Sequence, residues 1–198
     1  DFEFVSQIVP IIKKTKAYDI LPFQWSVHKW NSIDEEIKIE DGSNFLDFSS
    51  NDIELKFLES LLKALGNKGS IFVFKEGVEG RVLNNLKKKE ICKHYSSEIN
   101  SVTSRIKDAS PLAKDYYYDT RMWGSYSLKQ IIKSIPTSVS YDDEEGINDG
   151  MRANLAWFKC TDPNVSNEEK EKEKKLLLEY CAKDTYAMYD LVKYWMSK

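Results

Sequence analysis

The chain has 198 residues, 41% of them hydrophobic and 13% aromatic, which suffices for a sizeable core and excludes an intrinsically disordered polypeptide. A formal net charge of −3 argues against a surface built mainly to bind polyanions, and the longest apolar runs are too short to cross a bilayer. The three cysteines lack metal-binding spacing, and so sparse a set indicates a reducing compartment. We therefore predict one globular, cytoplasmic domain over residues 1–198.

The beginning of the chain predicts strands. Asp1 and Glu3 are separated by two positions, which on a strand places both carboxylates on one side of the sheet. Such a strand would ordinarily follow several apolar residues, so we expect the chain to be a fragment of a longer protein. Residues 22–30 alternate apolar and polar side chains and predict a second strand. The polar link 31–35 is short enough to join it to a partner within 37–48 as an antiparallel hairpin.

Helices and strands alternate further along. Helical spacing of apolar residues over 52–65 predicts an amphipathic helix. The wholly apolar run 71–74 predicts a central strand covered on both faces, with a helix after it. Ser127 is expected to cap a helix that ends at Ile135, and a long final helix is expected over 167–195. This alternation favours a layered α/β fold.

Two more acids stand where a helix would ordinarily present apolar residues. Asp184 interrupts the apolar stripe of the final helix, and Tyr180 lies one turn earlier on the same face. A lone aspartate there is also explained as a cap or an ion-paired core acid. Glu79 faces the same way as its apolar neighbours in the helix after the central strand, although the helix dipole alone also favours a first-turn glutamate.

Together the four acids Asp1, Glu3, Glu79 and Asp184 form a candidate metal site. Buried carboxylates repel one another and are costly to desolvate unless cations neutralise them. Oxygen ligands select hard cations such as Mg²⁺ or Mn²⁺, and two such ions can promote an in-line phosphoryl displacement.

The order of these residues resembles the DEDD superfamily of 3′-to-5′ exonucleases and, more closely, an uncharacterised bacterial domain family related to it. Besides the opening acids, the similarity includes segments 21–28, 124–129 and 180–185. The resemblance implies a ribonuclease-H-like fold, in which helices flank a mixed sheet of about five strands. It also implies that Asp1, Glu3 and Asp184 bind two Mg²⁺ or Mn²⁺ ions, with Glu79 as the candidate fourth ligand, and that Tyr180 orients the attacking water.

The function that this resemblance predicts is metal-dependent hydrolysis of phosphodiester bonds, by a 3′-to-5′ exonuclease acting on the 3′ end of single-stranded DNA or RNA. Glu79 departs from the pattern, because the superfamily usually has Asp there, and Asp108 is a reserve candidate for that ligand. The alternative is a catalytically silent nucleic-acid-binding or docking module with the same fold. Hydrolysis of small nucleotides is a third hypothesis.

Other residues have two interpretations each. Lys129 could contact a phosphate or simply lie on the surface. The aromatic run 116–118 and Trp123 could stack on unpaired bases, or could form an ordinary hydrophobic cluster. His28, a lone histidine in a predicted strand, is expected to have a packing role.

Overall fold

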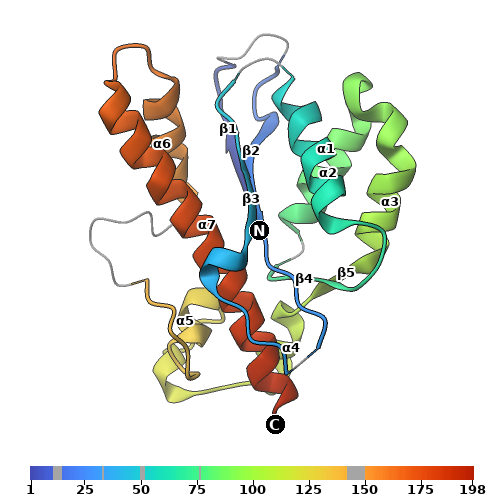
Figure 1. Ribbon diagram of the computed structural model, residues 1–198, viewed down its shortest axis with the longest axis vertical. Helices are drawn as coiled ribbons and strands as arrows, with labels where there is room; N and C mark the ends of the chain where they lie inside the picture. The colour runs from blue at the N-terminus through green and yellow to red at the C-terminus, as the bar shows by residue number, and fades with distance from the viewer. Residues whose placement is uncertain (11–14, 33, 50–51, 76, 142–149) are drawn as a thin grey trace.

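The computed structural model describes residues 1–198 except 11–14, 33, 50–51, 76 and 142–149. It has a mixed α/β fold with two sheets (Figure 1). The first is antiparallel, with β2 (Ile20–Val27) between β1 (Phe2–Ser6) and β3 (Ser43–Leu46). The second pairs β4 (Ile71–Val73) with β5 (Ile106–Asp108) in parallel.

Helices account for most of the remaining described chain. The α-helices are α1 (Ile53–Leu65), α2 (Glu79–Lys88), α3 (Ser96–Arg105), α4 (Ser110–Tyr116), α5 (Leu128–Ile132), α6 (Gly150–Thr161) and α7 (Asn167–Met196). Three short 3₁₀ segments are η1 (Ile39–Asp41), η2 (Glu90–Tyr95) and η3 (Thr120–Met122). None of the described helices offers a stretch both long and apolar enough to cross a membrane.

The three-stranded sheet lies between two groups of helices. Helices α1, α2 and α3 cover one face, and α6 and α7 cover the other (Figure 1). On the first face the ring of Phe57 from α1 meets Phe2 edge-on at a centroid distance of 5.2 Å. On the second face the side chain of Gln24 in β2 donates a buried hydrogen bond to the Leu177 carbonyl of α7 at 2.7 Å. Because β2 is covered on both sides, nearly all of its residues are buried.

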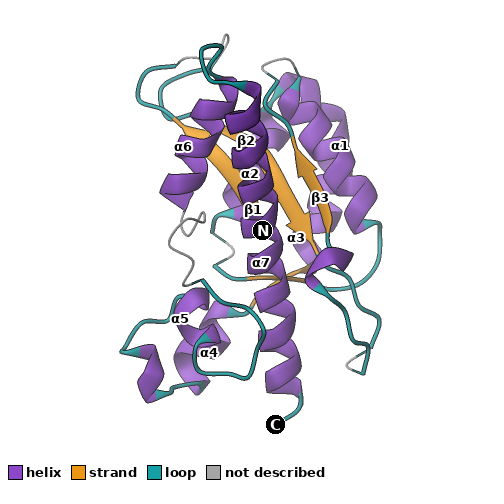
Figure 2. Ribbon diagram, turned by 60° about the vertical axis from the view of Figure 1, so that its left-hand side comes forward, coloured by secondary structure: helices purple, strands orange, loops and turns teal. Residues whose placement is uncertain are grey.

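Helix α7 extends past this sheet. Figure 2 shows it crossing the sheet and continuing to the region where α4 and α5 gather. Leu177 and Tyr180 pack with residues of β1 and β2, whereas Leu191 packs with Ile131 and Ile132 of α5. The middle of α7 therefore lies between two parts of the core.

The strongest local signals are confirmed. The helices predicted at 52–65 and 167–195 match α1 and α7 to within a residue. Gly66 ends α1 with φ = 60°, and its N–H donates to the Leu62 carbonyl. Ser127 caps α5 by accepting from the Gln130 amide, although that helix ends at Ile132.

The strand predictions need two corrections. The strand predicted over 22–30 ends at Val27, and residues 28–42, not a short link, lead to β3. The segment 71–74 is not a central strand, because in the described part of the chain β4 pairs with β5 alone. Phe72 in β4 is 39% exposed. The five strands are thus divided between two sheets instead of forming one mixed sheet.

Candidate functional site

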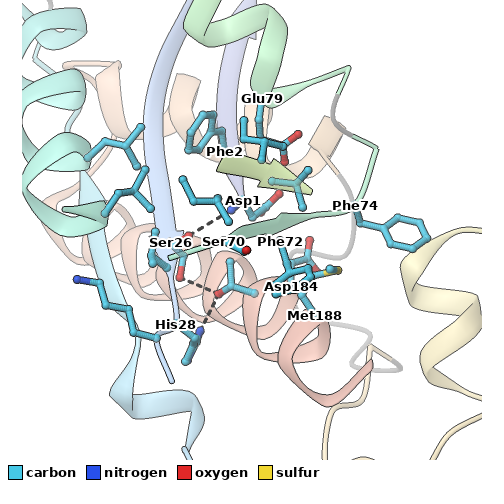
Figure 3. A pocket seen from close by; sticks show the side chains of 18 of the residues that line it. Asp1, Phe2, Ser26, His28, Ser70, Phe72, Phe74, Glu79, Asp184 and Met188 are labelled. Atoms are coloured by element: carbon cyan, nitrogen blue, oxygen red, sulfur yellow. Dashed lines mark hydrogen bonds between the residues drawn. The ribbon is translucent and has the colours of Figure 1, made fainter. Parts of the chain in front are cut away.

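A cavity of about 970 Å³ lies beside the amino end of β1, bordered by both sheets. Three of the four predicted acids line it. They are Asp1, Glu79 and Asp184, which reach the cavity from β1, α2 and α7 (Figure 3). Tyr180 and Lys129 line the same cavity. Residues from widely separated parts of the chain therefore share one cavity.

The two acids at the start of the chain face α7, as the spacing of two predicts. Asp1 continues the ladder of β1, because its amino group donates to the Ser26 carbonyl and its carbonyl accepts from the Ser26 amide at 3.0 Å. Its carboxylate accepts from the Cys181 thiol of α7, with Oδ2 3.3 Å from Sγ. Glu3 is buried opposite Gln24, and its Oε2 lies near Gly150 at the start of α6.

Glu79 is the first residue of α2 and is only 5% exposed. It shares the buried face of that helix with Val82, Leu83 and Leu86, which confirms its predicted orientation. Helix α2 thus contributes a carboxylate to the cavity at its amino end, where the helix dipole favours negative charge.

The carboxylate of Asp184 is surrounded by two tyrosines and a lysine. Tyr141 donates from Oη to Oδ1 of Asp184 at 2.6 Å. Lys129 donates from Nζ to the Tyr180 hydroxyl at 3.0 Å, and Nζ lies 4.6 Å from the centre of the Tyr180 ring. Burial raises the pKa of Asp184, and hydrogen bonding to Tyr141 and the charge of Lys129 act in the opposite direction. Burial likewise raises the pKa of Tyr180, and the charge of Asp184 raises it further.

Cys181 is buried in α7, and its thiol lies against the carboxylate of Asp1. Burial raises the pKa of its thiol, and the charges of Glu3, Asp184 and Glu79 raise it further, while Asp1 is its hydrogen-bond acceptor. From the sequence, the spacing of apolar residues along α7 predicted only that Cys181 would be buried. Its contact with Asp1 could not be found from spacing, because the two residues are 180 positions apart in the chain.

The donor set fits a hard cation, since carboxylates and a phenol oxygen are ligands that Mg²⁺ and Mn²⁺ accept. Within the ranges that the structure describes, however, no three His, Cys, Asp or Glu side chains converge closely enough to hold a metal ion. Asp1, Glu79 and Asp184 share a cavity without forming a closed ligand cluster.

Asp108, the reserve candidate, lies elsewhere. It ends β5, and its Oδ1 accepts from the backbone amides of Lys75 at 3.0 Å and Ser110 at 2.8 Å. It lines a separate, smaller cavity along the polar face of α2. These contacts give Asp108 the role of a cap between β4, β5 and α4.

The other candidates are also placed. Within the aromatic run, Tyr117 packs on Tyr194 and Trp195, but Tyr116 and Tyr118 are exposed, so the expected hydrophobic cluster holds for Tyr117 alone. Trp123 is 88% exposed. Lys129 is not simply a surface residue, because its Nζ donates to the Tyr180 hydroxyl.

His28 has the structural role that was expected. Its Nδ1 is hydrogen bonded to Thr185 and its Nε2 to the Ile39 carbonyl, each at 2.9 Å. Burial lowers its pKa. The imidazole therefore joins the end of β2 to α7 and η1.

These features define a mixed α/β domain in which three acidic residues, Asp1, Glu79 and Asp184, line one cavity. Residues 1–127 match a domain of unknown function, DUF2779, and the chain belongs to that family. No curated protein and no solved structure matches the chain. The matched region includes Asp1, Glu3 and Glu79 and ends before Lys129, Tyr180 and Asp184.

Proposed function

We propose that this protein is a metal-dependent nuclease with a ribonuclease-H-like fold, which removes nucleotides from the 3′ end of single-stranded DNA or RNA. The observation that carries the proposal is that Asp1, Glu79 and Asp184 line one cavity together with Tyr180 and Lys129, while the buried Glu3 lies two positions after Asp1. Such a group is costly to bury in an α/β core, because each carboxylate loses water and repels the others. A divalent cation would offset that cost.

The chemistry of the surrounding residues supports the same proposal. Mg²⁺ or Mn²⁺, when bound, would polarise the phosphate and lower the pKa of an attacking water. The Tyr180 hydroxyl, held by Lys129, would orient that water. The Lys129 ammonium lines the cavity and would attract a phosphate. Asp184 would then exchange its neutral phenol partner for a cation.

The strand order supports the fold part of the proposal. Three antiparallel strands come first in the chain, and the parallel strands β4 and β5 follow with helices between them. The ribonuclease-H-like arrangement has the same order along the chain, but its hairpin strands belong to one mixed sheet, whereas here the strands form two sheets. The family match is compatible with this assignment and carries no activity of its own.

The first test is metal binding. Thermal melting with and without Mn²⁺ should show a rise in Tm, since a ligand of the native state stabilises it by about 2.7 kcal/mol at a hundredfold excess over Kd. Asp184→Asn should abolish the rise. Asp115→Asn, which changes an exposed acid on α4, should keep it.

The second test is cleavage of end-labelled oligonucleotides. Mn²⁺-dependent shortening from the 3′ end, lost in Asp184→Asn and kept in Asp115→Asn, would support the proposal. One observation favours the silent alternative, namely that Asp184 already has Tyr141 as a donor while the acids stay apart. Nucleic-acid binding with no Mn²⁺ response and no cleavage would establish that alternative.

A further inference from the structure

Three aromatic side chains of one short segment project into solvent. Tyr116 is 84% exposed, Tyr118 61% and Trp123 88%. We call residues 116–123 the aromatic segment. In the described part of the chain, no large hydrophobic side chain is more exposed than Trp123 and Tyr116. None of these three described rings lines the cavity or belongs to a core cluster, so neither the candidate site nor packing accounts for them.

The two exposed tyrosines are presented by a fixed backbone. Between them Tyr117 packs inward on Tyr194 and Trp195. The Tyr117 hydroxyl is also hydrogen bonded to that of the buried Ser134, just after α5, at 3.0 Å. Because the backbone at Tyr117 is extended, the side chains on either side of it point away from the core.

The turn that carries Trp123 is fixed at the same place. The Arg121 guanidinium donates to the carbonyl of Ser134 at 2.6 Å, and the Gln130 side chain donates to the carbonyl of Arg121 at 2.7 Å. Met122 is fully buried. Trp123 follows it with φ = 50°, a left-handed conformation that bulky residues rarely adopt. Rings on so constrained a backbone lose little freedom when a ligand binds.

The surroundings of the aromatic segment are more basic than the rest of the chain. Residues 110–135 contain four basic and two acidic residues, a formal charge of +2, whereas the whole chain has −3. Exposed aromatic rings beside cations bind single-stranded nucleic acids, because bases stack on the rings and phosphates contact the cations. An apolar protein partner would have no use for the excess positive charge. The four basic residues are Lys114, Arg121, Lys129 and Lys133.

The aromatic segment leads into the wall of the cavity that holds the acids. Ser127, Leu128 and Lys129 line that cavity. Ser127 comes four residues after Trp123, and four residues span at most about 14 Å. One nucleic-acid strand could therefore contact both the cavity and the exposed rings.

We propose that the aromatic segment binds the unpaired bases of a single-stranded nucleic acid whose 3′ end lies in the cavity. Trp123, Tyr116 and Tyr118 stack on bases upstream of that end. The inference rests on the substrate of the proposed function and deepens it, because it adds a binding surface outside the cavity. It also gives the protein a preference for strands long enough to reach the rings over dinucleotides.

The test measures binding in chelator, so that metal-dependent cleavage does not interfere. The probe is an end-labelled oligothymidylate of about 12 nucleotides, or the oligouridylate of equal length, followed by fluorescence anisotropy. The parent is compared with Trp123→Ala and with Tyr116→Ala/Tyr118→Ala. Tyr18→Ala is the matched control, because Tyr18 is 66% exposed in the connection between β1 and β2, at the end of the sheet away from α4 and α5 (Figure 1).

We expect Trp123→Ala and the double tyrosine variant each to raise Kd by about fivefold to a hundredfold, since each base stacked on a ring contributes that much. Tyr18→Ala should leave Kd unchanged. All these positions are exposed, so Tm should shift by less than about 2 °C. Trp123→Phe should stay within about threefold of the parent's Kd while the oligonucleotide quenches less tryptophan fluorescence.

An unchanged Kd in both aromatic variants would overturn this inference and leave the metal-binding and cleavage tests of the proposed function untouched. Weaker binding of Trp123→Ala by a protein that never cleaves would support the inference and count against the enzyme. A parent that binds neither oligonucleotide would overturn it. Self-association of the parent that Trp123→Ala abolishes, without oligonucleotide binding, would assign the rings to a second copy and would also overturn it.

Discussion

The hydrogen bond between Tyr141 and Asp184 should contribute measurably to stability. The two oxygens lie 2.6 Å apart, and both side chains are partly buried, which limits the water that could replace the lost donor. A hydrogen bond to a charged group contributes about 1.5–3 kcal/mol. In a chain of this length each kcal/mol shifts Tm by about 2–4 °C, so Tyr141→Phe should lower Tm by about 3–12 °C at pH 8.

The assay is a double-mutant cycle in chelator, with thermal melts of the parent, Tyr141→Phe, Asp184→Asn and the double variant. In the Asp184→Asn background the acceptor is neutral, so losing the hydroxyl should cost only about 0.5–1.5 kcal/mol. The coupling energy should then be about 1 kcal/mol. An equal cost in both backgrounds would refute the argument that Tyr141 stabilises a buried charge.

Three further predictions concern pH dependence and packing. Because burial raises the pKa of Asp184, the native state binds more protons than the unfolded state above pH ~3.9, and the free energy of unfolding falls as pH rises from there through the native pKa. Asp184→Asn should flatten that fall in urea titrations at pH 4 to 8; an unchanged slope would contradict the assignment. Gly42→Ala would place Cβ 2.7 Å from Cε1 of His28 and should cost about 1–3 kcal/mol, whereas Gly77→Ala meets open space and should leave the urea midpoint nearly unchanged. Leu61→Ala removes a fully buried side chain and should cost about 2–5 kcal/mol by the same assay, and a cost below about 1 kcal/mol would show a loosely packed core there.

Local patterns predicted the helices better than the sheets. The spacing of apolar residues and the closing Gly66 are signals contained within α1 itself, and the same holds for the stripe of α7. A short apolar run such as 71–74 does not reveal which strands will lie beside it. Its edge position and the exposure of Phe72 follow from tertiary packing.

In the candidate site, too, local features were predicted and contacts between distant segments were not. Helical periodicity correctly placed Glu79 on a buried face and the partly buried Asp184 on the face of α7 that lines the cavity, because orientation on a helix is a local property. The contacts of Tyr141, Lys129 and Cys181 join segments about forty to 180 residues apart, as the 43 positions between Tyr141 and Asp184 illustrate. Spacing within one element carries no information about such meetings.

The length of α7 has a practical consequence for the limits of the domain. The family match ends at residue 127, yet Leu177 and Tyr180 cover apolar residues of β1 and β2. A polypeptide trimmed to the matched region would expose that face of the sheet to water and invite aggregation. The region matched by the family is thus shorter than the part of the chain that covers the sheet, and cloning boundaries should extend through Met196.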